Sequence, residues 1–345
     1  MLKSPRVSVL MAAYEAAATI GPAIDSALRQ SLSDLEVLVV DDGSTDETVE
    51  IVSSYGDPRV RLVRNPKNLG IPATRQRGAE EARGEYLAIL DSDDLAHATR
   101  IEEQAAYLDA HPECGVVGSW ARIVSPDGRF KKLSLKPTAA DALRARVLFR
   151  NLVKDATAMT RTALVRQYGF REEFPVCELT DLWQRMSRDH EVANIPAILT
   201  TYRDHDAGIT KRSPELMRRA KSRLAAEQLA ALGLQYGELD LSRHIALSKP
   251  GLITPDPTYL DWAEHWFLRL RAANRLSALY PGQAFELALG EYWWKLCRAA
   301  AGSELGRWRR FWRSPHRPAG LRYVASTAAS TARVALEQRL RPTRR

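Results

Sequence analysis

The sequence has few cysteines, no signal peptide and no apolar run long enough to span a membrane. Its three cysteines are far apart and match no zinc-ligand spacing, which favours a reducing compartment over a disulfide framework. The N-terminus enters an apolar strand at once and lacks a cleavage site. No apolar run in the 345 residues approaches the roughly 18 that a bilayer requires. We therefore expect the protein to stay in the cytoplasm.

The turn after the first predicted strand lacks the glycines of a dinucleotide-binding site. Residues 7–11 (VSVLM) predict a strand, and Ala12, Ala13 and Tyr14 follow where a dehydrogenase would carry G-x-G-x-x-G. A nucleotidylyltransferase would need a glycine-rich, basic loop at this point, and AAYEAAA is neither. These absences argue against both classes of enzyme.

The net charge of +8 is concentrated near the C-terminus. Residues 298–345 hold 12 arginines, no lysine and two acids, which gives +10 there and leaves −2 for residues 1–297. Such asymmetry suggests a tail that meets an anionic surface. No recognised nucleic-acid module accompanies the arginines, so we expect no nucleic-acid partner.

Aromatic residues interleave with these arginines. Trp308, Phe311 and Trp312 lie within residues 306–313 (GRWRRFWR), and a basic, aromatic, amphipathic segment can lie in a membrane interface. We therefore expect residues 306–345 to hold the protein peripherally at the inner face of the plasma membrane. The alternative is that the aromatic side chains pack on neighbouring helices and the arginines face water.

Short apolar runs alternate with helical patterns through the N-terminal half. Strands are predicted at 7–11, 35–40, 60–63 and 86–90, and helices at 19–30, 48–53, 73–82 and 98–110. This spacing predicts a parallel, doubly wound sheet. Further strands at 116–118 and 120–124, before a turn at 126–128, predict that the sheet becomes mixed.

Local patterns predict where elements begin and where the domains divide. Ser44 and Glu47 predict a capping box, and Pro196 bounds a strand predicted just after it. Ser213 with Pro214 is an N-cap and N1 pair that opens a helical region. We expect two domains, an α/β domain over residues 1–212 and a helical region with the basic tail over residues 213–345.

Carboxylates follow two of the predicted strands. They are Asp41, Asp42, Asp91, Asp93 and Asp94. Ligands of open α/β sheets bind beyond the carboxyl ends of the strands. Asp91 and Asp93 are two residues apart, so in an extended segment they project from the same side. Because Mg²⁺ takes carboxylate and phosphate oxygens, we predict a metal–diphosphate site here. The alternative is that these acids cap the next helix.

Five motifs in this order resemble the family 2 glycosyltransferases of the GT-A fold. They are SVLMAAYE, LEVLVVDDGSTDET, RNPKNLGIPATRQRG, GEYLAILDSDD and CELTDLW. The resemblance covers about residues 7–210. It implies a Rossmann-like, mostly parallel central sheet with helices on both faces, here followed by a helical region. It also implies an inverting transfer that uses a divalent cation, Mg²⁺ or Mn²⁺, and a nucleotide-diphosphate sugar, with a UDP-sugar favoured. The acceptor would be a carbohydrate or a lipid-linked saccharide, in cell-surface polysaccharide, lipopolysaccharide or glycolipid synthesis.

The resemblance also implies roles for individual residues. The donor-binding set is Ala12, Ala13, Tyr14, Asp42, Arg75, Asp91, Ser92 and His205. Asp42 matches the acid that binds the nucleotide base, with Tyr14 and the two alanines as the wall of the base pocket. Asp91 matches the ribose-side acid and Asp93 the metal ligand of an Asp-x-Asp motif. His205 matches a late histidine near the diphosphate, although a lone histidine is often a structural hydrogen-bonder.

The expected catalytic base is the feature in which this sequence departs from the family pattern. The base is normally the Asp of a Glu-Asp pair, and Leu179, which cannot accept a proton, stands there. Glu178 or Asp181 must then serve as general base, with Glu178 favoured. The structural alternative is that Glu178 caps the helix and Asp181 is a first-turn acid favoured by its dipole. A non-catalytic, nucleotide-sugar-binding partner of a glycosyltransferase complex is therefore the competing function.

Overall fold

The computed structural model describes residues 4–205, 213–301 and 303–325. The chain divides into an α/β unit, residues 1–143 with 151–221, and a helical unit, residues 144–150 with 222–345. The change of unit falls inside helix α9 (Pro214–Ala231). The expected domain boundary after residue 212 stays a prediction, and nothing in the sequence had indicated that residues 144–150 belong with the helices.

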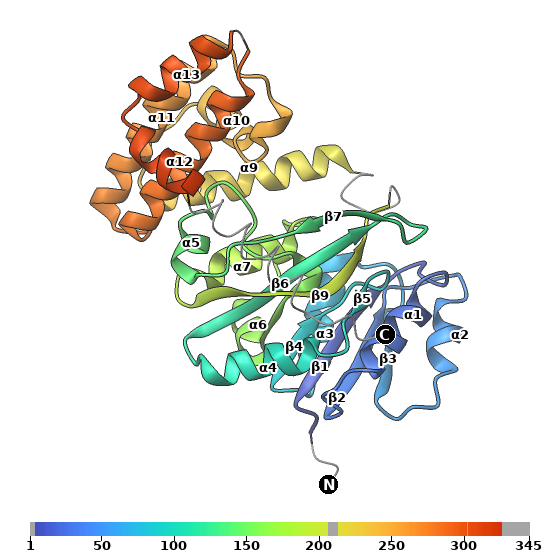
Figure 1. The fold of residues 1–345 in the computed structure, drawn as a ribbon. Helices are drawn as coiled ribbons and strands as arrows, with labels where there is room; N and C mark the ends of the chain where they lie inside the picture. Colours follow the sequence, from blue (N-terminus) through green and yellow to red (C-terminus); the bar gives the residue numbers. More distant parts are fainter. Residues whose placement is uncertain (1–3, 206–212, 302, 326–345) are drawn as a thin grey trace. The chain divides into compact units, whose positions relative to one another are not determined.

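One sheet organises the α/β unit. Its strands are β1 (Val7–Ala13), β2 (Leu35–Asp41), β3 (Val60–Arg64), β4 (Tyr86–Ile89), β5 (Leu95–Ala96), β6 (Cys114–Val124), β7 (Phe130–Ser134), β8 (Met159–Arg161) and β9 (Glu191–Arg203). Their order is β3-β2-β1-β4-β8-β6-β9-β5, with β7 paired to β6 (Figure 1). The first four are parallel, whereas β8 is antiparallel to both β4 and β6. The predicted sheet, parallel first and then mixed, is confirmed.

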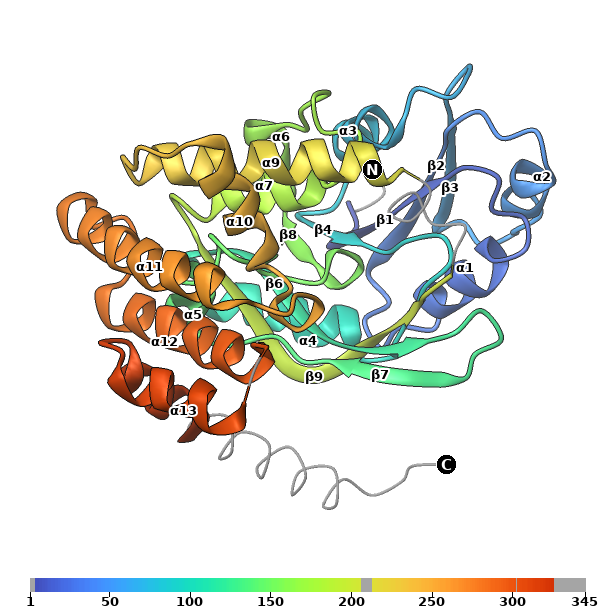
Figure 2. The same cartoon turned by 90° about the horizontal axis from the view of Figure 1, so that it is seen from above.

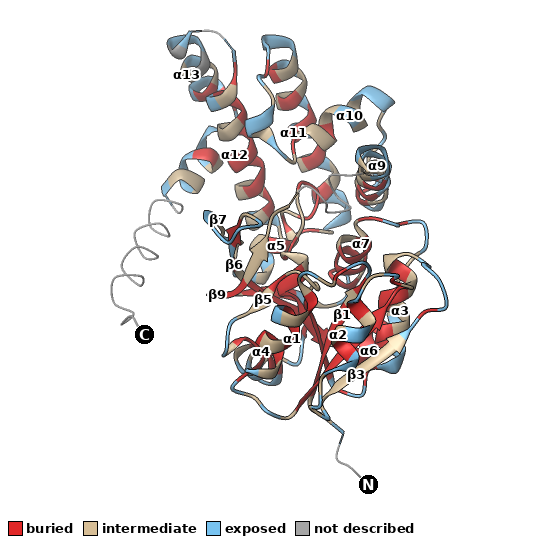
Figure 3. Ribbon diagram, turned by 90° about the vertical axis from the view of Figure 1, so that its right-hand side faces the viewer, coloured by how far each residue is buried: buried red, intermediate tan, exposed pale blue. Residues whose placement is uncertain are grey.

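Helices connect and cover these strands. They are α1 (Ile20–Leu28), α2 (Thr48–Ser53), α3 (Ile71–Glu81), α4 (Arg100–Ala110), α5 (Ala140–Arg144), η1 (Asp155–Thr157), α6 (Thr162–Tyr168) and α7 (Glu178–Met186). The strands β1 and β2 are almost wholly apolar and buried, which is typical of parallel strands covered on both faces. Figure 3 draws the buried residues around β1 in red. Helix α3 packs closely on β1, because a Cβ at Gly78 would lie 2.3 Å from Cδ1 of Leu10. This packing fixes the position of the helix that carries Arg75.

The predicted capping box at the start of α2 is wrong. The Ser44 hydroxyl instead accepts a hydrogen bond from the backbone N–H of Glu15 at 3.0 Å. Asp46 takes the place of Ser44 at the start of the helix, since its carboxylate accepts hydrogen bonds from the backbone N–H and the hydroxyl of Thr48. The N-cap residue, Glu47, makes no capping bond with its side chain. Ser44 therefore ties the turn after β1 to the turn after β2, a long-range need that a local pattern cannot show.

The prediction that Pro196 bounds a strand is also wrong. Strand β9 runs through Pro196, and the register with β6 is irregular there, because Ser119 lies opposite Ile195 while Trp120 lies opposite Ile198. Proline lacks the N–H of a ladder bond and is tolerated in a strand at such bulges. The strand is consequently long enough to carry its C-terminal end to the carboxyl edge of the sheet.

The helical unit is built from α10 (Glu238–Ala246), η2 (Pro250–Leu252), α11 (Pro257–Ser277), α12 (Gly282–Ala299) and α13 (Glu304–Arg313). Helices α11, α12 and α13 lie side by side (Figure 2). Residues 144–150 complete its core, since the Phe149 ring lies 4.2 Å from that of Tyr292 and Arg146 pairs with the buried Glu291 at 2.7 Å. No helix in the described ranges is long and apolar enough to cross a membrane.

Candidate active site

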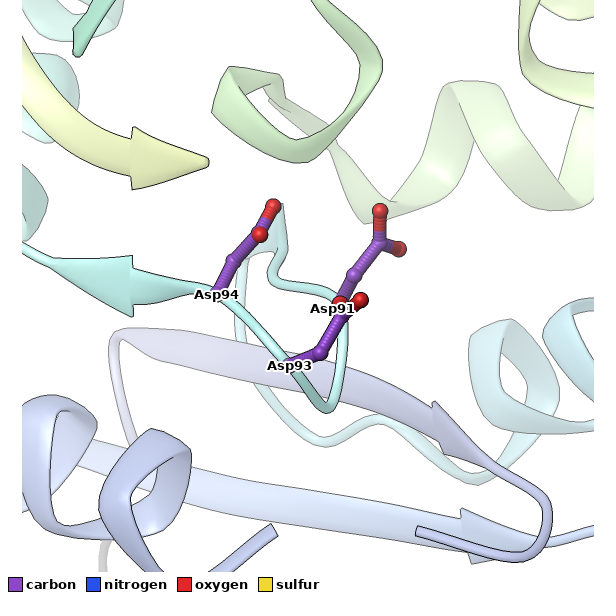
Figure 4. A group of neighbouring side chains, drawn as sticks. All are labelled: Asp91, Asp93 and Asp94. Carbon is purple, nitrogen blue, oxygen red and sulfur yellow. The ribbon is translucent and has the colours of Figure 1, made fainter. Parts of the chain in front are cut away.

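Three carboxylates gather in the turn between β4 and β5, which we call the acid turn (residues 91–94). The backbone N–H of Asp94 bonds the carbonyl of Asp91 at 3.1 Å and closes the turn. Asp91, Asp93 and Asp94 then project from one short stretch of backbone (Figure 4), and one oxygen from each lies within 4.8 Å of the others. The predicted grouping of acids beyond this strand is therefore present, and it includes Asp94, to which the sequence assigned no role.

The electrostatics of the acid turn suit a cation. Burial and the charge of Asp91 raise the pKa of Asp93. Burial, Asp91 and Asp93 raise the pKa of Asp94 well above its usual value. The backbone N–H of Arg203 donates to Oδ1 of Asp94 at 2.8 Å, but Oδ2 is buried with no hydrogen-bond partner among the described residues. Clustered carboxylate oxygens are the ligands that Mg²⁺ or Mn²⁺ prefers, and a cation would relieve the repulsion among them, so these residues fit such an ion.

His205 lies against the acid turn. Its Nε2 is 2.5 Å from Oδ2 of Asp93, and both side chains are partly exposed. The histidine follows β9, whose last residue, Arg203, also donates through Nε to the backbone carbonyl of Asp93 at 3.2 Å. The structure thus brings His205 to the predicted metal ligand, from a position 112 residues further along the chain.

Arg75 joins the acid turn to α7. Its Nη2 lies 2.7 Å from Oδ1 of Asp91, and its Nη1 pairs with Glu178. All three side chains were predicted site residues, and the structure brings them together from three separate elements. The Arg75 and Glu178 side chains are almost fully buried, so this guanidinium fixes the distance between the acid turn and the start of α7.

The two acids predicted as the base are both ion-paired. Asp181 is 1% exposed and binds Arg171 and Arg185, the latter at 2.9 Å. Glu178 is held by Arg75, and Leu179 is buried. The role of either acid as the base stays a prediction. The two arginines that bind Asp181 favour a structural role for this residue.

The predicted base pocket lies at the same edge of the sheet. Ala13 is in register with Asp41, and the backbone N–H of Asp42 bonds the carbonyl of Ala13 at 2.8 Å. The Asp42 carboxylate accepts bonds from Nδ2 of Asn65 and from the backbone N–H groups of two following loop residues, each at 2.8 to 2.9 Å. Tyr14 is half exposed and Ala12 half-buried beside it. Asp42 therefore also organises the loop after β3, which the sequence did not indicate.

Sequence reasoning missed a second polar group beside the acid turn. Nζ of Lys154 lies 3.2 Å from the centre of the Tyr202 ring, and burial together with Asp91 raises the pKa of that phenol. Asp155 follows Lys154 and is half-buried. The available signal was the charged pair itself, which interrupts an otherwise apolar stretch, NLVKDATAM. Ser92, a predicted donor-binding residue, is half-buried within the acid turn.

Comparisons with known proteins agree with this arrangement. Residues 8–172 match the model of glycosyl transferase family 2. An uncharacterized glycosyltransferase of Haemophilus influenzae is 29% identical over 217 residues, which cover 59% of this chain and 67% of that protein. The succinoglycan biosynthesis protein ExoO of Rhizobium meliloti is 42% identical over 127 residues, which cover 37% of this chain and 36% of that protein.

A solved structure shows the same fold. The crystal structure of S. aureus TarS 1-349 in complex with UDP has a TM-score of 0.54 and 22% identity, covering 84% of this chain and 88% of that one. The chain therefore has the GT-A fold followed by a helical region, and the predicted fold class is confirmed.

Proposed function

We propose that the protein is an inverting glycosyltransferase that moves a sugar from a nucleotide-diphosphate sugar to a hydroxyl acceptor. The observation that carries this proposal is the acid turn, whose three carboxylates meet at the carboxyl edge of a family 2 domain. A divalent cation bound there would stabilise the charge of the departing diphosphate as a Lewis acid. UDP is the favoured nucleotide, because TarS was crystallised with it.

The donor would lie along the carboxyl ends of β1, β2 and β4. Asp42 and Tyr14 would meet the nucleotide base, Asp91 would meet the ribose, and Asp93 would hold the cation with its two neighbouring carboxylates. Arg75 would orient Asp91, because it already bonds that carboxylate. His205, next to Asp93, would donate to a phosphate oxygen. Ser92, Ala12 and Ala13 would complete the pocket.

The acceptor would be a carbohydrate or a lipid-linked saccharide, in the synthesis of a surface polysaccharide, lipopolysaccharide or glycolipid. The similarity to a succinoglycan biosynthesis protein supports this class of product. The competing function, a non-catalytic partner, predicts nucleotide binding without transfer or slow hydrolysis. Release of UDP from a UDP-sugar therefore separates the two functions.

Thermal unfolding with UDP and Mn²⁺ tests donor binding. Ligand at about 100 times its Kd stabilises the folded state by roughly 2.7 kcal/mol, so the melting temperature should rise with UDP and rise further with Mn²⁺. We expect Asp42→Ala to reduce the melting-temperature shift produced by UDP. Mn²⁺ should still increase the shift that remains, since Asp42 is not one of the three grouped carboxylates. Equal shifts for wild type and variant would show that Asp42 only organises its loop.

We further propose that the basic tail holds the enzyme at the cytoplasmic face of a membrane. Basic residues near an anionic leaflet each gain about 1 kcal/mol, and aromatic side chains suit the interface. In α13, Trp312 is 52% exposed and Phe311 is buried, so one part of the aromatic set packs on the unit and another faces solvent. Residues 326–345 of the predicted tail lie outside the described residues.

Liposome flotation tests this membrane role. At low salt, the full-length protein should float with anionic liposomes and remain in the soluble fraction with neutral ones, because the attraction is electrostatic. A chain ending at Ser303 should lose this binding. Unchanged flotation of the shortened chain, or no flotation of the full-length protein, would leave α13 as a purely structural helix.

A further inference from the structure

The proposed reaction needs a base that takes the proton of the acceptor hydroxyl. Both acids of α7 that were predicted for this role are already ion-paired. Asp181 is enclosed by two arginines and Glu178 is held by Arg75. We propose that Asp155, at the start of η1, is the general base of this enzyme. The inference rests on the proposed glycosyltransferase function and assigns a catalytic residue within that same site.

The sheet topology places Asp155 at the donor edge. Strand β8 runs antiparallel to β4, and the backbone N–H of Ile89 bonds the carbonyl of Ala158 at 2.9 Å. Beyond this pair the chain runs from the end of β4 through Leu90 to Asp91, while the chain that leads into β8 comes from Asp155. Both acids therefore lie beyond the same end of the same strand pair, although they are far apart in the sequence.

The surroundings of Asp155 differ from those of the α7 acids. Its Oδ1 accepts one hydrogen bond, from Nδ2 of Asn151 at 2.9 Å, and it forms no ion pair with any residue in the described part of the chain. Lys154, the neighbouring cation, is engaged with the Tyr202 ring. The Asp155 side chain is half-buried, and the bond from Asn151 orients its carboxylate through Oδ1 alone.

The charges near Asp155 link it to the reacting groups. The charges of Lys154 and Arg75 lower the pKa of Asp155, and the charge of Asp91 raises it. Burial raises the pKa of Asp155 above its usual value, which makes an acid a better proton acceptor at neutral pH. Asp91 belongs to the acid turn, and η1, which begins at Asp155, packs against β4, the strand that leads to this turn. Asp155 would therefore lie beside the diphosphate end of the proposed donor.

The proposed step is a single displacement. The acceptor hydroxyl gives its proton to the carboxylate of Asp155, and the acceptor oxygen forms a bond to the anomeric carbon of the sugar. The bond from that carbon to the diphosphate oxygen breaks, and its electron pair leaves with the nucleoside diphosphate. Asp155 then returns the proton to water. In this scheme Glu178 is a positioning residue, because it holds Arg75.

Nucleoside diphosphate release tests this assignment with water as the acceptor. The probes are UDP-glucose, UDP-galactose, UDP-N-acetylglucosamine and GDP-mannose, each with Mn²⁺, and the best donor for wild type is then used for the variants. Asp155→Asn should lower turnover roughly 10²-fold or more, because the amide keeps the shape but cannot take a proton. Asp155→Glu should recover part of the turnover. The matched control is Asp141→Asn, at an exposed acid on α5, which should behave as wild type.

Donor binding separates a missing base from a damaged fold. The thermal shift of Asp155→Asn with UDP and Mn²⁺ should equal that of wild type, which shows an intact donor site. Near-normal turnover of Asp155→Asn, or a 10²-fold loss in Glu178→Gln alone, would overturn the role of Asp155 and leave the glycosyltransferase function standing. Absence of release by wild type from all four donors would contradict the proposed function and the base together.

Discussion

Asp93→Ala is expected to abolish the Mn²⁺-dependent part of the UDP thermal shift without lowering the stability of the ligand-free protein. Burial and Asp91 raise the pKa of Asp93, so its negative charge costs free energy in the empty site. A group with a raised folded-state pKa stabilises the fold at low pH and loses this contribution as the pH rises through that pKa. At pH 7.5 removal of the carboxylate should therefore leave the melting temperature unchanged or raise it.

The metal-dependent shift should be lost for a different reason. The cation needs carboxylate oxygens, and the remaining pair, Asp91 and Asp94, is fixed by Arg75 and by the backbone of Arg203. At about 100 times its Kd, a bound ligand contributes roughly 2.7 kcal/mol, and this is the size of the loss we expect. Asp127→Ala, at an exposed turn acid, is the matched control. Full Mn²⁺ enhancement in the Asp93 variant would exclude the acid turn as the metal site.

The sequence predicted the N-terminal half of the fold well because its strands are short, buried and apolar. Residues 7–11 and 35–40 were predicted as strands and lie within β1 and β2. The predictions failed where the role of a residue depends on a contact with a segment far away in the sequence. Ser44 looks like a cap but bonds Glu15, and Pro196 looks like a strand boundary but sits at an irregularity of a long strand.

The candidate site divides in the same way. Acids that follow strands could be predicted, because the carboxyl ends of parallel strands share one edge. The link from Arg75 to Glu178, 103 residues away, and the placement of Asp155 beside β4 depend on tertiary packing and on an antiparallel strand. The hydrophobic periodicity of a short stretch of sequence does not indicate contacts between distant residues. The family resemblance pointed to α7 for the base, and only the ion pairs of Asp181 show that this carboxylate is already bound.

Asp181 provides the last prediction, which concerns stability rather than chemistry. Its carboxylate is buried between Arg171 and Arg185, and Arg185 also donates to the carbonyls of Tyr168 and Gly169. This cluster ties α7 to the end of α6. Removing one partner of a buried ion pair typically costs about 3 to 5 kcal/mol, because the remaining charge is left uncompensated.

We expect Asp181→Asn to lower the free energy of unfolding by roughly 2 to 3 kcal/mol. This is at or below the lower end of the range for a buried pair, since Arg171 keeps some access to water. Turnover per folded molecule should stay within about threefold of wild type, a change of about 0.7 kcal/mol in activation free energy. Asp189→Asn, which removes an exposed carboxylate bonded to the Tyr168 hydroxyl, is the control and should change stability by about 0.5 kcal/mol or less. Urea unfolding and UDP release measured on the same samples would separate the two quantities. A variant of normal stability and normal UDP shift with a 10²-fold loss of turnover would contradict the structural role and support Asp181 as the base, because loss of a general base lowers the rate without lowering stability or donor binding.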